Sequence, residues 1–344
     1  MEHRPLGRTG ISVSKLCLGA MMLGPWGTDG DEAIRIIHAA LDAGIDFIDT
    51  ADVYSAGGSE EIVGRALKGR RDRVVLATKL VFPVGDDPDP NRRGASRRWI
   101  AQAVEDSLRR LQTDWIDLYQ LHRPTPETDL EETLDALTDL VRQGKIRAFG
   151  TSTYPPSLLV EAQWVARDRR LIRPHTEQPP YSILNRGVEA EVLPVCERHG
   201  IGVIPWSPLA GGFLTGRYGT GGEEPWPASP ARARLTDIFD PSLPANQVKI
   251  RAARQLGALA EEAGLTLIEM AIAFVLEHPA VTAPIIGPRT MAHLESQLAA
   301  ADVALPADVL DRIDEIVPPG TVLNPADAGL ENPALDAARR RRRA

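Results

Sequence analysis

Residues 44–54 read Gly-Ile-Asp-Phe-Ile-Asp-Thr-Ala-Asp-Val-Tyr: a short apolar run that ends in a carboxylate, with a tyrosine five residues further on. This pattern is typical of a buried strand of a parallel sheet. The strand is expected to end at Asp49, and Tyr54 would lie in the loop that follows. An acid and a tyrosine at the end of a buried strand are candidates for proton-transfer chemistry.

Two later apolar runs also stop at an ionisable residue. Residues 74–78 lead into Lys79, and residues 115–121 lead into His122. If these strands are parallel neighbours of the first, all of these side chains meet at one end of one sheet. That end is where barrels and open sheets of this class place their active sites.

Eight strand segments alternate with helical segments along the chain. The strands are expected at residues 16–20, 46–49, 74–79, 116–121, 147–151, 175–178, 202–206 and 283–286. Apolar residues that recur every three or four positions predict helices at 31–43, 59–68, 100–111, 130–141, from 155, at 188–199, 247–263 and 290–300. Eight strand–helix pairs favour a closed (β/α)8 barrel, the TIM barrel, over an open sheet.

The segments outside these pairs predict a hairpin and two long loops. Residues 5–14 are polar, with glycines at turn positions, and indicate an N-terminal β-hairpin before the first barrel strand. Residues 80–95 and 207–246 follow strand ends, so both loops would lie over the C-terminal face of the barrel. Loops of this length in a compact domain are usually functional or disordered.

We expect one domain over residues 1–322. The remaining residues, 323–344, read as a flexible tail that ends in five consecutive arginines at 339–343. Such a run is usually a solvated segment.

The composition narrows the class of protein. The 344 residues are 43% hydrophobic and 25% charged, as in soluble globular proteins. A net charge of −8 argues against a nucleic-acid surface. Cys17 and Cys196 have no paired spacing, which fits a reducing cytoplasm. We see no signal peptide and no apolar run long enough to cross a membrane.

The ionisable residues at the strand ends suggest a carbonyl chemistry. A tyrosine has a pKa of about 10, and a nearby ammonium lowers it. Lys79 is the candidate for that ammonium, Asp49 for its counter-ion, and His122 for a hydrogen bond to the substrate oxygen. Together with Tyr54 they would protonate a carbonyl oxygen as a hydride reaches the carbon. No side chain supplies a hydride, so a nicotinamide cofactor is required.

The sequence resembles the aldo-keto reductase superfamily, and within it the bacterial aldo/keto reductase-type oxidoreductases. Three blocks carry the resemblance: residues 44–54, 77–79 (Ala-Thr-Lys) and 116–122 (Ile-Asp-Leu-Tyr-Gln-Leu-His). The resemblance covers roughly residues 4–300. It implies a (β/α)8 barrel that binds NADPH and reduces aldehydes or ketones. By motif, the implied catalytic residues are the general acid Tyr54, its tuning pair Lys79 and Asp49, and the carbonyl-orienting residue His122.

The resemblance also implies how a nicotinamide would be held. Ser152, Thr153 and Gln178 would bind its carboxamide, although the family usually has asparagine where Thr153 stands. Trp206 would stack on the ring. The full set of cofactor-binding residues that we expect is Gly19, Ala20, Met21, Ser152, Thr153, Gln178, Trp206, Ser207, Leu209, Ala210, Gly211, Gly287, Arg289 and Gln297.

Preference for NADPH over NADH rests mostly on Arg289, which would hold the 2′-phosphate. A common form of the family has arginine and glutamate at the positions of His293 and Ser296, and the neutral imidazole cannot replace the guanidinium. Gln297 can still bind adenine as the family's asparagine would.

The substrate and the partners are less defined. Trp26 and Phe82 are candidates for the wall of a pocket for a small carbonyl substrate, and the oligomeric state is open. Similar proteins include keto-deoxysugar reductases of natural-product pathways. A second hypothesis is a cofactor-binding regulatory subunit, as in the potassium-channel β subunits of the same family. A third, a metal-dependent barrel hydrolase, is disfavoured because the seven histidines include no close ligand pair.

Overall fold

The computed structural model describes all residues except 29, 218–234 and 331–344. The described chain forms an eight-stranded parallel sheet in the order β10-β3-β4-β5-β6-β7-β8-β9, which confirms the predicted barrel class. Amide groups of Thr282 and Ile285 donate to the carbonyls of Val203 and Pro205 across the remaining seam. These bonds close the sheet into a TIM-like barrel.

Each predicted strand has a counterpart. The eight strands are β3 (Cys17–Gly19), β4 (Phe47–Asp49), β5 (Val75–Leu80), β6 (Ile116–Leu121), β7 (Ile146–Ser152), β8 (Thr176–Gln178), β9 (Gly202–Val203) and β10 (Ile285–Ile286). The last two are shorter than predicted because Pro205 and Pro284 lie within the predicted segments, and a proline has no N–H to donate to a ladder. Trp206 rejoins the sheet through an isolated bridge to Pro180.

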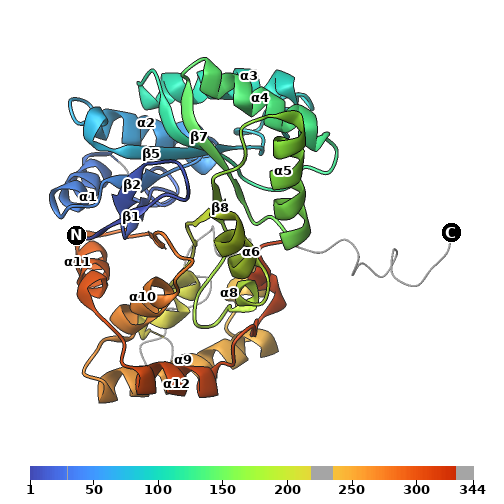
Figure 1. The fold of residues 1–344 in the computed structure, drawn as a ribbon. Helices are drawn as coiled ribbons and strands as arrows, with labels where there is room; N and C mark the ends of the chain where they lie inside the picture. Colours follow the sequence, from blue (N-terminus) through green and yellow to red (C-terminus); the bar gives the residue numbers. More distant parts are fainter. Residues whose placement is uncertain (29, 218–234, 331–344) are drawn as a thin grey trace.

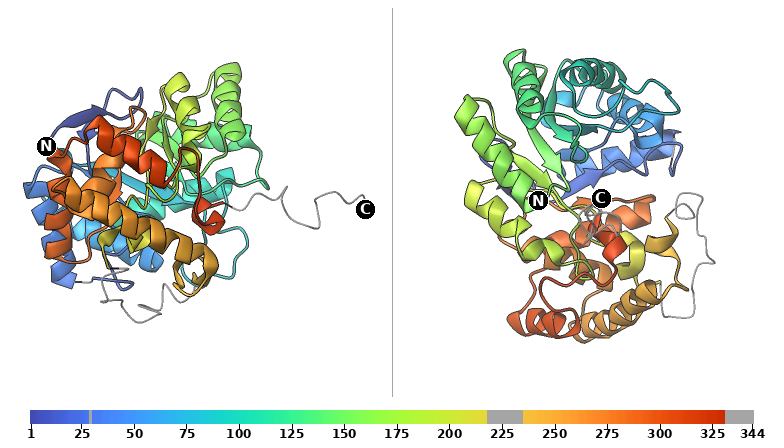
Figure 2. Two further views of the ribbon diagram at one scale, coloured as in Figure 1. Left: turned by 90° about the horizontal axis from the view of Figure 1, so that it is seen from below. Right: turned by 90° about the vertical axis from the view of Figure 1, so that its right-hand side faces the viewer.

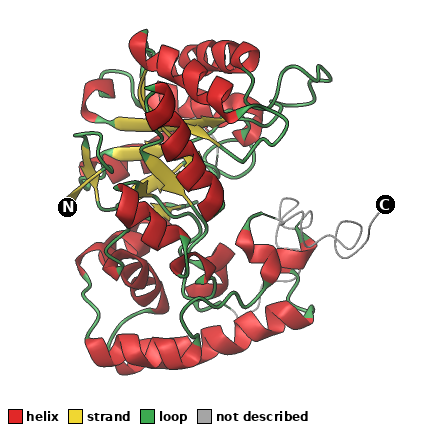
Figure 3. Ribbon diagram, turned by 45° about the vertical axis from the view of Figure 1, so that its right-hand side comes forward, coloured by secondary structure: helices red, strands yellow, loops and turns green. Residues whose placement is uncertain are grey.

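The helices surround the sheet (Figures 1 and 3). They are α1 (Gly30–Asp42), α2 (Gly58–Ala66), α3 (Arg97–Leu111), α4 (Leu130–Arg142), α5 (Pro156–Arg169), α6 (Val192–His199), α8 (Thr236–Phe239), α9 (Pro244–Glu262), α10 (Leu267–Glu277), α11 (Met291–Leu298) and α12 (Ala307–Ile316). None of those described is long and apolar enough to span a membrane.

The helix α10 was not predicted. It contacts α9 and α11, and most of its side chains are buried. A helix that is apolar on every side shows no stripe, so its periodicity is invisible in the sequence. A capping box does mark its start: Thr266 accepts from the Glu269 amide, and the Glu269 carboxylate accepts from the Thr266 amide. The predicted helix at 247–263 is α9, which lies outside α10 and packs on α12 (Figure 2).

The barrel interior is filled in layers. One layer combines Leu6 and Val13 of the N-terminal hairpin, β1 (His3–Pro5) and β2 (Ser12–Ser14), with inward-facing strand residues, and so closes the bottom of the barrel. These strand residues are Cys17, Phe47, Ala77, Leu118, Ala148, Ile204 and Ala283. Side chains alternate along a strand, so the residue two positions further on also points inward. That next layer therefore contains Asp49, Lys79 and Gln120.

The C-terminal segment returns to the body of the protein. Asn324 is buried and donates from its side chain to the carbonyl of Asp237 and to the side chain of Asn246. Asp327 forms an ion pair with Lys249, whose side chain is fully buried. The first residues of the segment expected to be a flexible tail are thus tied to α9. The arginine run at 339–343 lies outside the described residues.

The pair of Lys249 and Asp327 yields a stability prediction. We expect Asp327→Asn to lower the free energy of unfolding by about 1–3 kcal/mol, less than the roughly 3–5 kcal/mol for a fully broken buried pair, because the amide still accepts a hydrogen bond. Chemical denaturation measures the change. The control is Asp311→Asn, an exposed acid on α12, which should shift stability by no more than about 0.5 kcal/mol. Equal effects of the two substitutions would show that the pair does not anchor the C-terminal segment.

Candidate active site

A buried ion pair lies at the C-terminal end of the barrel. The Lys79 ammonium donates to Asp49 Oδ2 at 2.6 Å, to the Thr50 carbonyl at 2.8 Å and to the Tyr54 hydroxyl at 3.2 Å. The Lys79 side chain has no exposed surface. Its three N–H groups all have acceptors, so Lys79 is held in one position.

Asp49 is bound from several strands at once. Its Oδ1 accepts from the side-chain amides of Gln120 and Gln178, each at 3.0 Å. The carboxylate of β4 is therefore linked to β5 through Lys79, to β6 through Gln120 and to β8 through Gln178. Sequence reasoning missed the role of Gln120, although its position two residues before His122 puts both residues on the same side of the chain.

Tyr54 is placed by an unusual turn. After β4 the chain enters a 3₁₀ turn (Tyr54–Gly57) in which Ser55 and Ala56 adopt φ angles of 52° and 54°. Left-handed backbone is uncommon for residues other than glycine. The turn also positions Trp26, whose backbone amide donates to the Ser55 hydroxyl at 3.1 Å.

Aromatic contacts bring the remaining predicted residues to the same place. The rings of Tyr54 and His122 meet edge to face with centroids 5.7 Å apart. The ring centroids of Phe82 and His122 are 5.0 Å apart, and those of Trp26 and Tyr54 are 6.4 Å apart. Trp26 is half exposed, with 49% of its surface accessible. The two residues predicted to line a substrate pocket thus flank the two rings.

The electrostatics differ from the expectation in one respect. Burial raises the pKa of Tyr54 above 10, and the opposing effect of Lys79 is smaller. The expected lowering of this pKa was wrong, because the sequence shows the neighbouring ammonium but not the degree of burial. Burial opposes the charged form of Lys79, but Asp49 and Tyr54 raise its pKa above the usual value. Burial, with Lys79, holds the pKa of His122 well below 6.5. At neutral pH the tyrosine and the histidine are both uncharged.

A cavity of about 2030 Å³ opens beside these residues and extends across the barrel mouth toward α11. Most residues expected to hold a cofactor line it: Gly19, Met21, Ser152, Gln178, Trp206, Ser207, Leu209, Ala210, Gly211, Gly287, Arg289 and Gln297. Ala20 and Thr153, which were also expected to hold the cofactor, are buried and do not line the cavity. His293 and Ser296 also line it, as does the C-terminal segment 325–330, which the sequence did not indicate.

Several buried polar groups along this cavity have no hydrogen-bond partner among the described residues. The indole N–H of Trp206, the Nδ1 atom of His122 and the amide oxygen of Gln297 are buried without a hydrogen-bond partner in the described part of the chain. Buried polar groups are normally satisfied, so such atoms along one cavity are suited to binding a polar ligand. Gly329 packs against the Trp206 ring, where an added Cβ would come within 2.8 Å.

A second buried acid supports the turn after β7. Thr153 has a φ of 58°, and the Glu177 carboxylate accepts from the Thr151 hydroxyl and from the Tyr154 amide at 3.1 Å. Burial raises the pKa of Glu177 to about 7, against the lowering effect of these hydrogen bonds. Glu177 therefore holds the segment that presents Ser152 and Thr153.

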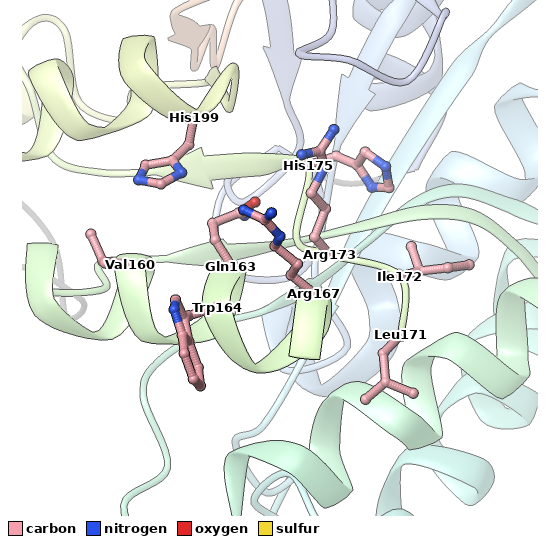
Figure 4. A pocket seen from close by; sticks show the side chains of 9 residues that line it. All are labelled: Val160, Gln163, Trp164, Arg167, Leu171, Ile172, Arg173, His175 and His199. Carbon is pink, nitrogen blue, oxygen red and sulfur yellow. The ribbon is translucent and has the colours of Figure 1, made fainter. Parts of the chain in front are cut away.

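A smaller cavity of about 500 Å³ lies near the start of β8, away from the C-terminal strand ends that carry the candidate site (Figure 4). Its lining comes from α5, from the segment before β8 and from the end of α6. It includes Trp164, whose side chain is 67% exposed, and none of the predicted site residues. The barrel mouth is thus the place where the candidate catalytic side chains and the larger cavity coincide.

Known proteins of one family match most of this chain. The profile of the aldo/keto reductase family matches residues 15–318. The uncharacterized oxidoreductase YrpG of Bacillus subtilis is 41% identical over 92% of this chain and 96% of its own length. The aldo-keto reductase YhdN of the same organism is 37% identical over 86% and 87%. A probable voltage-gated potassium channel subunit beta of Arabidopsis thaliana is 36% identical over 92% and 97%.

The raised pKa of Glu177 predicts a pH-dependent effect of its replacement. An exposed carboxyl titrates near 4.5, so the unfolded chain loses this proton at a lower pH than the folded chain, whose pKa is about 7. Glu177 therefore stabilises the fold less as the pH rises through that window. The stability of the wild type relative to Glu177→Gln should fall from pH 4.5 to 7 and then level off.

Thermal or chemical denaturation of both proteins at several pH values in this window tests the prediction. Glu161→Gln, at an exposed position on α5, is the control and should give a difference that does not vary with pH. A constant difference for Glu177→Gln as well would contradict the raised pKa.

Proposed function

Because this chain belongs to the aldo/keto reductase family and is an oxidoreductase, we propose that it reduces an aldehyde or ketone to an alcohol with NADPH. The family typically uses NAD(P)H. The observation that carries the proposal is the contact of Tyr54 with the Lys79–Asp49 pair beside His122 at the mouth of a large cavity.

Tyr54 acts as the general acid. Lys79 has only N–H donors, so in their contact the Tyr54 oxygen is the acceptor and keeps its own hydrogen for another partner. Its raised pKa keeps that proton in place at neutral pH. When the proton moves to a carbonyl oxygen, the Lys79 ammonium stabilises the phenolate that remains.

His122 orients the carbonyl. Its lowered pKa leaves the imidazole neutral, with one N–H to donate and no charge to repel Lys79. The rings of Phe82 and Trp26 lie against His122 and Tyr54, and a bound substrate would contact this apolar surface.

The cofactor residues divide into two groups. Ser152, Gln178 and Trp206 would hold the nicotinamide end near Tyr54, while Arg289 and Gln297 would hold the adenosine end near α11. When bound, the reduced nicotinamide supplies the hydride to the substrate carbon. The backbone of the segment 207–211, with a φ of 65° at Gly211, would approach the phosphates.

A second candidate follows from the relatives named as potassium channel β subunits, which match 92% of this chain. In that case the protein would bind the cofactor as a regulatory subunit and turn over little substrate. NADPH binding with negligible turnover of reactive aldehydes would favour this candidate over the reductase.

The general acid is tested with Tyr54→Phe. We expect kcat for a reactive aldehyde to fall by about 10²–10⁴-fold, the usual contribution of a positioned acid, while NADPH binding measured by fluorescence is unchanged. Because the pKa of Tyr54 exceeds 10, wild-type kcat/KM should not fall between neutral pH and about pH 9. Tyr119→Phe, a buried tyrosine outside the cavity lining, is the control. Undiminished turnover by Tyr54→Phe would refute the assignment.

The NADPH preference is tested with Arg289→Ala. Loss of a charged hydrogen bond to the 2′-phosphate should weaken NADPH binding by about 10–100-fold and leave NADH binding nearly unchanged. Titration of each cofactor measures both constants, and Arg98→Ala, at an exposed position on α3, serves as the control. Equal losses for the two cofactors would show that Arg289 does not read the 2′-phosphate.

A further inference from the structure

Arg123 is a cation at the catalytic end of the cavity. It follows His122 directly after β6, lines the cavity, and is partly buried. Its Nη1 donates to the carbonyl of His122 at 2.7 Å, and its guanidinium lies 6.0 Å from the centre of the Trp206 ring. These contacts place Arg123 beside His122 and Trp206 in the lining of the cavity.

No carboxylate pairs with Arg123 within 4 Å in the described chain. The buried cations Lys79, Lys249 and Arg186 do have such partners, which are Asp49 for Lys79, Asp327 for Lys249, and Glu189 and Asp314 for Arg186. Partial removal of a charge from water is costly without a partner, so the partly buried Arg123 calls for an explanation.

The neighbouring acids are already engaged. Asp49 is bound by Lys79, Gln120 and Gln178, and Glu177 accepts from Thr151 and Tyr154. Burial lowers the pKa of Arg123, and the interactions with Tyr54 and Glu177 that would raise it are smaller. The guanidinium of Arg123 therefore retains N–H groups for a ligand and gives this end of the cavity a positive charge.

We propose that Arg123 recognises an anionic group, a carboxylate or a phosphate, carried by the carbonyl substrate. This inference rests on the proposed reductase function and names the substrate class. A planar guanidinium binds either anion through two parallel hydrogen bonds. An anion bound there would supply the missing counter-charge and hold the carbonyl next to Tyr54 and His122.

Matched pairs of aldehydes test the proposal. One pair is 4-carboxybenzaldehyde and its neutral analogue methyl 4-formylbenzoate, and the other is glyceraldehyde 3-phosphate and glyceraldehyde. The wild type should prefer the charged member of at least one pair by 10-fold or more in kcat/KM. The pair that shows the preference distinguishes a carboxylate from a phosphate.

Arg123→Gln should lower kcat/KM for the preferred anion by about 10–100-fold, mostly through KM, because the variant loses charged hydrogen bonds to the anion. Activity on the neutral analogue should change by less than about threefold, which also shows that the variant is folded. Arg123→Lys, which keeps the charge without the planar fork, should restore part of the preference.

Three results would overturn the proposal. Equal losses for charged and neutral aldehydes would assign Arg123 to the reaction centre in general. No charge preference in the wild type, with normal turnover of the neutral aldehydes, would refute the inference and leave the reductase function intact. Absence of turnover for all four aldehydes despite NADPH binding would refute the reductase function and the inference with it.

Discussion

The ion pair between Lys79 and Asp49 is the constraint on which the site depends. A fully buried ammonium is stable only with a counter-charge and acceptors for all three of its N–H groups, and Asp49, Thr50 and Tyr54 provide them. Asp49 in turn binds amides from β6 and β8. Neither partner can be removed without leaving the other charge buried, so the pair fixes the position of Tyr54 and ties four strands together.

The strand register makes this arrangement possible. Asp49 pairs with Ala77, and Lys79 pairs with Gln120, in a parallel sheet whose inward-facing residues form successive layers. The apolar layer that includes Phe47, Ala77 and Leu118 fills the barrel. In the next layer, the side chains of Asp49, Lys79 and Gln120 are hydrogen-bonded to one another. Outside the barrel wall, Glu177 holds the Thr151–Tyr154 turn in a similar way, with its carboxylate accepting from a hydroxyl and a backbone amide. Buried acids thus position two of the segments that surround the cavity.

The sequence predicted the elements whose signal is local. Apolar runs that stop at Asp49, Lys79 and His122 located the strand ends, and most of the residues that the aldo-keto reductase motifs assign to a cofactor line the cavity. Features that depend on contacts between distant residues could not be predicted. The apolar helix α10 has no stripe, and the return of Asn324 to Asn246 joins positions far apart in the chain. The pKa of Tyr54 was expected to be lowered and is instead raised. A motif identifies the charged neighbours of Tyr54, but its burial depends on the whole fold.

Two cations at the barrel mouth have different surroundings: Lys79 forms an ion pair with Asp49, and Arg123 lines the cavity. Lys79 is neutralised by Asp49, and Tyr54 and His122 carry no charge at neutral pH, so the deepest part of the site is neutral before reaction. Negative charge that develops there meets an ammonium already fixed in place, which requires no rearrangement. Arg123 lies beside this neutral centre as a cation that has no ion-pair partner among the described residues. In the proposed reductase, the proton donor Tyr54 would thus be held by compensated charges. The charge of Arg123 would face the space that a substrate enters, so the proton transfer and the selectivity for a substrate would rest on different residues.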